Sequence, residues 1–358
     1  ALRYLDNRGI TEETRKKFGL GYAGVYSTEL YAYLKKQGYE DGILRESGLI
    51  SFDEKKGGYD KFWSRVMFPI FDVQSRVIAF GGRNLGEGMP KYLNSPETKL
   101  FDKSRNLYGL NIARTSRKSY IIICEGYMDV ISLHQAGYQN AVATLGTALT
   151  PQQASLLKRY TDQVYLCYDS DDAGIKASLR AIPILKDVNL AVKVLNLKPY
   201  KDPDDFIKAL GTEAFEERIQ DAVNSIMFEI EVMEKETNMK DPESKTNFLN
   251  KVAKRISLLN TALERDNYIE AVAAKYSVNK QNLLELVNQI GASRGLIAEK
   301  HRSSVDRKPK KEREDGILSA QKILLTWMIE DKNLFNKVKG IIDPFDFKDD
   351  LFHKVAEL

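Results

Sequence analysis

Residues 117–210 constrain the fold most, because short apolar runs alternate there with stretches of helical character. The apolar runs read SYIIICEG, NAVATLG, QVYLCYDSD and LAVKVLNL, and the helical stretches read YMDVISLHQAG, TPQQASLLKRY, DAGIKASLRAIPILKD and PDDFIKAL. Strands followed by helices at this spacing predict a mainly parallel sheet with helices on its faces. One helix start is predicted closely, since Thr150 is a typical N-cap residue and Pro151 suits the first helical position.

The sequence on either side has a different character, and 358 residues are too many for one ordinary core. The first part combines a short helix at TEETRKKFGLGYA with a β-hairpin at RVMFPIFDVQSRVIAFGGRNLG. After residue 210, apolar residues three and four apart predict a helical bundle. We therefore expect an α/β protein, α+β overall, divided into an α+β subdomain at 1–116, the sheet subdomain at 117–210, a bundle at 211–290, a charged linker at 291–316 and the helical start of a further domain at 317–358.

The composition, with 43% hydrophobic and 29% charged residues, is that of a globular protein. No apolar run reaches the roughly 20 residues of a membrane helix and no signal peptide is evident, so we expect a cytoplasmic protein that does not bind a membrane. Cys124 and Cys167 lie in apolar runs and are expected to be buried thiols without a disulfide. The three histidines share no ligand spacing with them, which argues against zinc.

Glycines gather in the second half of the predicted hairpin and just beyond it, at positions 81, 82, 86 and 88. They are reminiscent of a phosphate-binding loop, but no GxxxxGK[ST] pattern follows them. We interpret these glycines as turn residues.

Acidic residues follow three of the predicted strands. Open α/β sheets bind ligands along the rim where the carboxyl ends of parallel strands meet, so these acids are expected to lie close together. Two carboxylates about 4 Å apart repel by roughly 4 kcal/mol near a protein surface, so protons or cations must enter such a cluster. Oxygen ligands without His or Cys favour Mg²⁺ or Mn²⁺, and hence phosphoryl or nucleotidyl transfer. The acids are Glu125, Asp129, Asp169, Asp171, Asp202 and Asp204.

An alternative explanation holds for each acid taken singly. Aspartate is favoured at turns and helix N-caps for reasons of backbone hydrogen bonding alone. We assign Asp172 and Asp205 to that group, and surface acids without a ligand remain the alternative for the whole set.

Several strings resemble a known family. IIICEGYMDV followed by LCYDSDDAG resembles the Toprim domain of primases, topoisomerases and some nucleases. Together with FPIFDVQSRVIAFGGRNLG, PKYLNSPET and LYGL, over about residues 1–290, they resemble the RNA polymerase domain of DnaG-type bacterial primases. The resemblance implies a central Toprim sheet, mixed or mainly parallel with flanking helices. It also implies template-directed synthesis of short RNA primers on single-stranded DNA, a nucleotidyl transfer that serves DNA replication.

The resemblance also implies roles for individual residues. The six acids listed above would hold two or more Mg²⁺ or Mn²⁺ ions, with Glu125, Asp169 and Asp171 catalytic and Glu125 also placed for proton transfer at the growing 3′-hydroxyl. Nucleotide and template binding would fall to basic and polar residues of the first subdomain. These residues are Arg65, Arg83, Lys91, Asn94 and Lys103.

The partners implied are single-stranded DNA, NTPs, the RNA primer/DNA hybrid and the replicative helicase, the last through the truncated segment 317–358, with the chain acting as a monomer. The family's zinc-binding domain has no counterpart in this sequence. Two alternatives stay open. One is a nicking or topoisomerase enzyme, which would need a nucleophilic tyrosine in a separate domain, and the other is a non-catalytic scaffold for DNA and a helicase.

Overall fold

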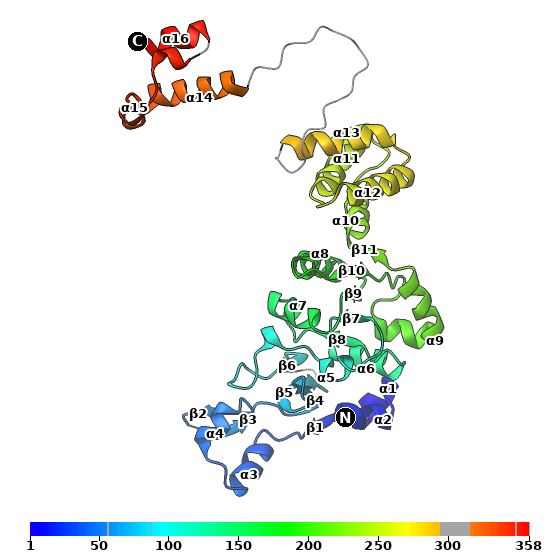
Figure 1. Ribbon diagram of the computed structural model, residues 1–358. Coiled ribbons are helices and arrows are strands. Elements are labelled where there is room, and N and C mark those ends of the chain that lie inside the picture. The colour runs from blue at the N-terminus through cyan, green and yellow to red at the C-terminus, as the bar shows by residue number, and fades with distance from the viewer. Residues whose placement is uncertain (56, 87, 294–315, 348, 358) are drawn as a thin grey trace. The chain divides into compact units, whose positions relative to one another are not determined.

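The computed structural model describes residues 1–55, 57–86, 88–293, 316–347 and 349–357. It divides into two compact units, residues 1–297 and 298–358, which are described separately below. The expected linker at 291–316 falls almost entirely outside the described residues, except that its first residues continue a helix to Ser293. Figure 1 shows the chain coloured from its N-terminus to its C-terminus.

The first part of the chain is built around a four-stranded antiparallel sheet. The predicted hairpin is confirmed, because β4 and β5 pair antiparallel within the strand order β1-β4-β5-β6. Thr11 caps α2 by accepting a hydrogen bond from the N–H of Thr14 at 3.2 Å. The elements are α1 (Leu2–Asn7), α2 (Glu12–Phe18), β1 (Gly21–Ala23), α3 (Glu29–Lys36), α4 (Asp41–Glu46), β2 (Ile50–Asp53), β3 (Gly57–Asp60), β4 (Arg65–Phe71), β5 (Val77–Asn84), β6 (Tyr92–Asn94), η1 (Lys103–Arg105) and α5 (Leu110–Ala113).

The interpretation of Gly81 and Gly82 as turn glycines is wrong. Both lie inside strand β5, in register with β4 and β6. A Cβ at Gly81 would stand 2.6 Å from the ring of Tyr127, and one at Gly82 would stand 2.8 Å from Phe62. The absence of a side chain at Gly81 therefore allows this sheet to pack closely against α6 of the central part of the chain.

The central part is a five-stranded sheet in the order β11-β10-β9-β7-β8. All neighbours are parallel except the short edge strand β11, which confirms the prediction of a mainly parallel sheet. Thr150 caps α7 with Pro151 at its first position, also as predicted. The elements are β7 (Tyr120–Cys124), α6 (Tyr127–Gln135), β8 (Ala141–Ala143), α7 (Pro151–Lys158), β9 (Gln163–Leu166), α8 (Asp172–Asp187), β10 (Ala191–Val194), α9 (Pro203–Gln220) and β11 (Val223–Asn224).

Helices cover both faces of this sheet. Side chains of α6 and α9 pack on one face, in the same apolar cluster as Phe68 and Ile122, while α7 and α8 pack on the other with Ile121 and Ile123. The alternation along YIIIC thus supplies apolar side chains to both faces, as a strand buried on two sides requires. Since the first cluster also contains Phe68 and Ile70 of β4, the antiparallel sheet and the central sheet share one core.

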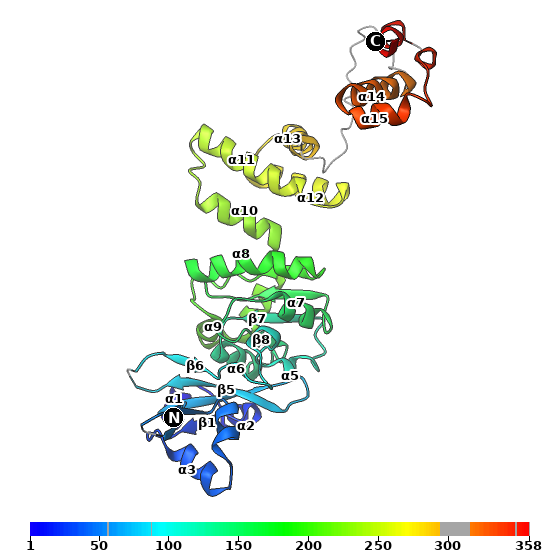
Figure 2. The same ribbon diagram turned by 90° about the vertical axis from the view of Figure 1, so that its left-hand side faces the viewer.

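The bundle predicted after residue 210 begins somewhat later, because α9 runs to Gln220 and β11 adds to the sheet. Helices α10 (Ser225–Lys235), α11 (Pro242–Ser257), α12 (Ala262–Tyr276) and α13 (Lys280–Ser293) then form their own apolar core. Figure 2 shows α11, α12 and α13 gathered together beyond α10.

The second unit is helical over its described residues, as expected for 317–358. It contains α14 (Gly316–Glu330), α15 (Lys332–Val338), the short η2 (Pro344–Asp346) and α16 (Asp350–Glu357). Among the described residues of the whole chain, none of the helices has the length and apolar character needed to span a bilayer. Cys124 and Cys167 are buried free thiols, as predicted.

Candidate active site

Two of the predicted acids meet at the carboxyl ends of neighbouring strands. Glu125 follows β7 and Asp169 follows β9, and the backbone N–H of Asp169 donates to Oε1 of Glu125 at 3.1 Å. Burial and the neighbouring carboxylates Glu125 and Asp202 raise the pKa of Asp169 to about 6. Burial raises the pKa of Glu125 as well, and the charge of Asp171 adds to that shift. The charged forms of Glu125 and Asp169 are therefore destabilised, and a nearby positive charge would stabilise them.

Asp129 is placed by the start of α6. Its Oδ2 accepts the N–H of Gly126 at 3.0 Å, which closes the first turn of the helix. The side chain is almost fully buried, and this burial, together with the charges of Asp202 and Asp169, holds the pKa of Asp129 well above its usual range.

Asp171 and Asp202 are N-cap residues. Oδ1 of Asp171 accepts the N–H of Gly174 at 2.9 Å at the start of α8, and Oδ1 of Asp202 accepts the N–H of Asp205 at 2.8 Å at the start of α9. The sequence had assigned the helix-start role to Asp172, but Asp172 is the first helical residue and Asp171 is the cap. The capping contact occupies one oxygen of Asp171 and leaves the other without a bond to the helix.

Gly174 is a residue that sequence reasoning missed. A Cβ at this position would stand 2.0 Å from the carbonyl oxygen of Asp169 and 2.9 Å from its backbone nitrogen. The first turn of α8 therefore lies directly against the backbone of Asp169, and only glycine permits that approach. The glycine in the string DSDDAG was the available signal.

Asp204 differs from the other acids because basic groups surround it. Its Oδ2 accepts from Nη1 of Arg8 at 2.9 Å and from Nζ of Lys208 at 2.6 Å. Its Oδ1 accepts from the hydroxyl of Ser132. The side chain is only 2% exposed.

Basic residues face these acids across one pocket, here called the charged pocket. Arg83 lies over the rings of Tyr4 and Tyr92, with its guanidinium carbon 4.8 and 5.2 Å from the ring centres. Arg8 and Lys201 also line the pocket, and sequence reasoning missed both. The charged side chains that line it are Arg8, Arg83, Lys91, Lys201, Glu125, Asp129, Asp169, Asp202 and Asp204.

Two of the predicted binding residues lie outside the charged pocket. Arg65 is buried and donates to the carbonyl oxygens of Gly82 and Pro90, at 3.1 and 3.0 Å. Lys103 lies in η1, where its carbonyl oxygen accepts from the side chain of Gln153. Neither residue lines the charged pocket.

Asn94 lines the charged pocket but is engaged within the protein. Its Nδ2 donates to the carbonyl oxygen of Leu145 at 2.8 Å, and its Oδ1 accepts from the hydroxyl of Tyr127 at 2.7 Å. These two bonds join β6 of the antiparallel sheet to the central part of the chain.

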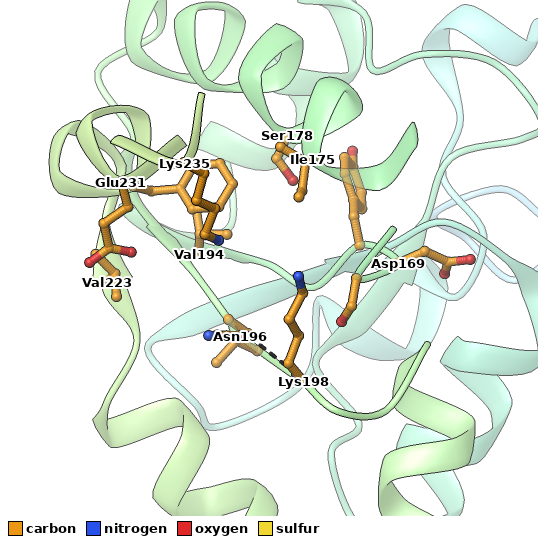
Figure 3. Close-up of a pocket in the computed structure, with 13 residues that line it drawn as sticks. Asp169, Ile175, Ser178, Val194, Asn196, Lys198, Val223, Glu231 and Lys235 are labelled. Atoms are coloured by element: carbon orange, nitrogen blue, oxygen red, sulfur yellow. Dashed lines mark hydrogen bonds between the residues drawn. The ribbon is translucent and has the colours of Figure 1, made fainter. Parts of the chain in front are cut away.

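A second hollow adjoins Asp169, between α8, the ends of β9 and β10, and α10. Figure 3 shows that the carboxylate of Asp169 points away from Lys198 and Lys235, which line this hollow. Asp169 also lines the charged pocket.

The donor set fits a hard divalent cation. No three His, Cys, Asp or Glu side chains among the described residues already converge as a metal site. Yet Glu125 and Asp169 are adjacent and only partly buried, and the nearest basic atom to Asp169, Nζ of Lys201, stands 3.9 Å away. Carboxylate oxygens facing an open pocket are ligands that Mg²⁺ accepts while it keeps several waters.

Comparisons with known families agree with this arrangement. Residues 1–114 match the family described as "DNA primase catalytic core, N-terminal domain", residues 122–207 match "Toprim-like", and residues 226–281 match "DnaB-helicase binding domain of primase". The third match covers α10, α11 and α12 and ends at the start of α13, whereas the sequence had led us to expect the helicase contact at 317–358.

Individual proteins are similar over most of the chain. A DNA primase of Clostridium acetobutylicum is 40% identical over 97% of this chain, which spans 58% of that relative's length. A crystal structure of a DNA primase domain from Pseudomonas aeruginosa is 35% identical, with a TM-score of 0.68 over 81% of this chain and 92% of that one. A DnaG primase catalytic domain bound to ssDNA is 33% identical, with a TM-score of 0.67 over 78% of this chain and 90% of that one.

Proposed function

Because the chain belongs to the DnaG-type family of bacterial DNA primases, we propose that it catalyses template-directed synthesis of short RNA primers on single-stranded DNA. Toprim domains and primases depend on divalent metal, generally Mg²⁺. The observation that carries the proposal is the charged pocket, in which the carboxylates at the ends of β7 and β9 face guanidinium and ammonium groups. A polymerase site needs both, because a triphosphate must be neutralised opposite its metal ligands.

We assign the roles as follows. Glu125, Asp169 and Asp171 are the catalytic metal ligands, with Asp129 and Asp202 supporting them, and Mg²⁺ or Mn²⁺ would activate the 3′-hydroxyl and neutralise the triphosphate when bound. Two or more ions are proposed because the acids come from three separate loops.

The proposed anion-binding residues are those whose side chains line the charged pocket. Arg83 is held in place by Tyr4 and Tyr92, so its guanidinium is oriented before any phosphate arrives. Arg8 and Lys91 line the same pocket. For Arg65 and Asn94 the contacts within the protein favour a structural role, and Lys103 is retained only as a candidate for template contact outside the pocket.

The proposed partners follow from the same assignment. They are NTPs, the single-stranded template, the primer/template hybrid, and a DnaB-type helicase that binds residues 226–281, mainly α10–α12. We propose that the chain acts as a monomer at the replication fork in the bacterial cytoplasm.

A chelator titration separates this proposal from a DNA-binding scaffold. Incorporation of labelled NTPs on an unstructured single-stranded template with Mg²⁺ or Mn²⁺ should stop when EDTA exceeds the metal, while DNA binding should persist. Binding without metal-dependent incorporation would favour the scaffold, and a covalent adduct between protein and DNA would favour a nicking enzyme.

A further inference from the structure

The carboxylate of Asp204 has no oxygen without a protein partner. Ser132 bonds Oδ1, while Arg8 and Lys208 share Oδ2. Charge-assisted bonds of this kind are the strongest that a carboxylate makes in a protein, and the side chain is 2% exposed. A cation could bind Asp204 only by breaking these bonds.

The charges around Asp204 also oppose a metal. Two basic groups stand within 3 Å of its Oδ2, whereas the nearest basic atom to Asp169 stands at 3.9 Å. A divalent ion at Oδ2 would be repelled by both basic groups at short range, in a partly buried setting where screening is weak. Asp169 offers the same ligand chemistry with a single ammonium at a greater distance.

Arg8 gains a fixed position from Asp204. The two residues are 196 positions apart, and their ion pair ties the end of α1 to the start of α9. The guanidinium carbon of Arg8 lies 5.8 Å from the ring centre of Tyr4, the same ring that Arg83 covers at 4.8 Å. The Arg8 side chain is 33% exposed and lines the charged pocket, so part of it remains accessible to a ligand.

We propose that Asp204 is a positioning residue that holds Arg8 toward the phosphates of the bound nucleic acid, and that it does not bind the divalent metal. This inference rests on the proposed function for the identity of the ligand. It departs from the sequence expectation, in which Asp204 was one of six metal ligands.

The sign of the effect on DNA binding distinguishes this role from simple electrostatics. Removing a negative charge beside a phosphate site should by itself strengthen binding of a polyanion. Loss of a positioning contact should weaken binding, because Arg8 then has to be ordered by the ligand. Asp205 provides a matched control, since Asp205→Asn changes the same charge one residue away at an exposed position.

The experiment uses the full chain and two probes. In EDTA, the affinity for a fluorescein-labelled oligodeoxythymidylate should fall roughly fivefold to tenfold in Asp204→Asn and Arg8→Ala, and no further in the double variant, while Asp205→Asn should bind as well as wild type or better. Free Mn²⁺, followed by its paramagnetic resonance, should bind Asp204→Asn within about twofold of wild type and Asp169→Asn at least about tenfold more weakly.

Tighter oligonucleotide binding by Asp204→Asn, or loss of Mn²⁺ affinity equal to that of Asp169→Asn, would overturn the inference. If Asp204→Asn does not fold, Lys208→Met decides the metal question, because freeing Oδ2 from one ammonium should raise Mn²⁺ affinity at least about tenfold if Asp204 is a ligand, and by no more than about twofold through the lost charge if it is not. Neither probe requires primer synthesis. A wild-type chain that fails to bind the oligonucleotide would count against the proposed function, while the Mn²⁺ measurement would still decide the role of Asp204.

Discussion

The backbone N–H of Asp169 donates to Oε1 of Glu125 at 3.1 Å, which joins the ends of two neighbouring parallel strands through a carboxylate. This hydrogen bond places Asp169 beside Glu125, and it neutralises neither carboxylate. Each group therefore keeps a raised pKa, for which burial is the largest cause. A site of this kind is electrostatically costly until a cation binds it.

Asp169→Asn should stabilise the metal-free protein above about pH 6. The pKa of Asp169 is 3.8 in an ordinary setting and about 6 in the folded chain, so between these values the folded state holds a proton that the unfolded state has lost. Raising the pH through this window removes stability, and asparagine avoids that loss. In EDTA at about pH 7.5 we expect Tm to rise by roughly 2–4 °C, with no gain near pH 3.

The control for this variant is Asp205→Asn, which removes an exposed carboxylate from the same region. Its Tm should stay within about 1 °C of wild type at both pH values. A lower Tm for Asp169→Asn at pH 7.5 would mean that the Asp169 carboxylate stabilises the metal-free fold.

Metal affinity should depend on pH in the same window. A divalent ion competes with the proton on Asp169, so the apparent affinity for Mn²⁺ should fall up to about tenfold per pH unit below about pH 6 and level off above it. Isothermal titration between about pH 5 and 8 measures this slope. An affinity that stays constant across the range would show that Asp169 does not bind the ion.

Gly174→Ala should damage the site through the backbone. The new Cβ would stand 2.0 Å from the carbonyl oxygen of Asp169, so the turn before α8 must move. We expect a loss of about 1–3 kcal/mol of unfolding free energy, with weaker Mn²⁺ binding. The matched control is Gly42→Ala in α4, where a Cβ meets nothing within 4 Å and should cost nothing. Equal effects of the two variants in urea unfolding would refute the close approach.

Tyr127→Phe should loosen the connection between the two sheets. It removes the bond from the Tyr127 hydroxyl to Asn94 but keeps the ring, which stacks on Phe68 with a centroid distance of 5.0 Å. We expect a loss of about 1 kcal/mol in urea unfolding, compared with no change for Tyr33→Phe at an exposed position of α3. An unchanged free energy of unfolding for Tyr127→Phe would show that the bond contributes nothing.

The sequence predicted what depends on local pattern. Alternation of apolar runs with helical periods was enough for the parallel sheet, and the N-cap at Thr150 followed from residue type. The meeting of Glu125 and Asp169 followed from topology, since parallel strands end on one rim.

Contacts between distant segments could not be predicted in this way. No local signal links Arg8 to Asp204, so the ion pair that distinguishes Asp204 from the other acids was invisible in the sequence. Gly81 was misread for the same reason, because its role depends on a ring from α6. Arg65 was expected near the template, yet burial turns its donors toward backbone carbonyls.

The most direct test of metal-dependent nucleotidyl transfer at the strand ends is extension of an RNA primer annealed to single-stranded DNA, which avoids any requirement for initiation. With Mg²⁺ or Mn²⁺ and labelled NTPs, wild type and Asp205→Asn should add templated nucleotides at similar rates. Asp169→Asn should be slower by about 100-fold or more. Primer extension by Asp169→Asn at the wild-type rate would contradict metal-dependent transfer at the strand ends. So would a wild-type chain that extends no primer at any metal concentration.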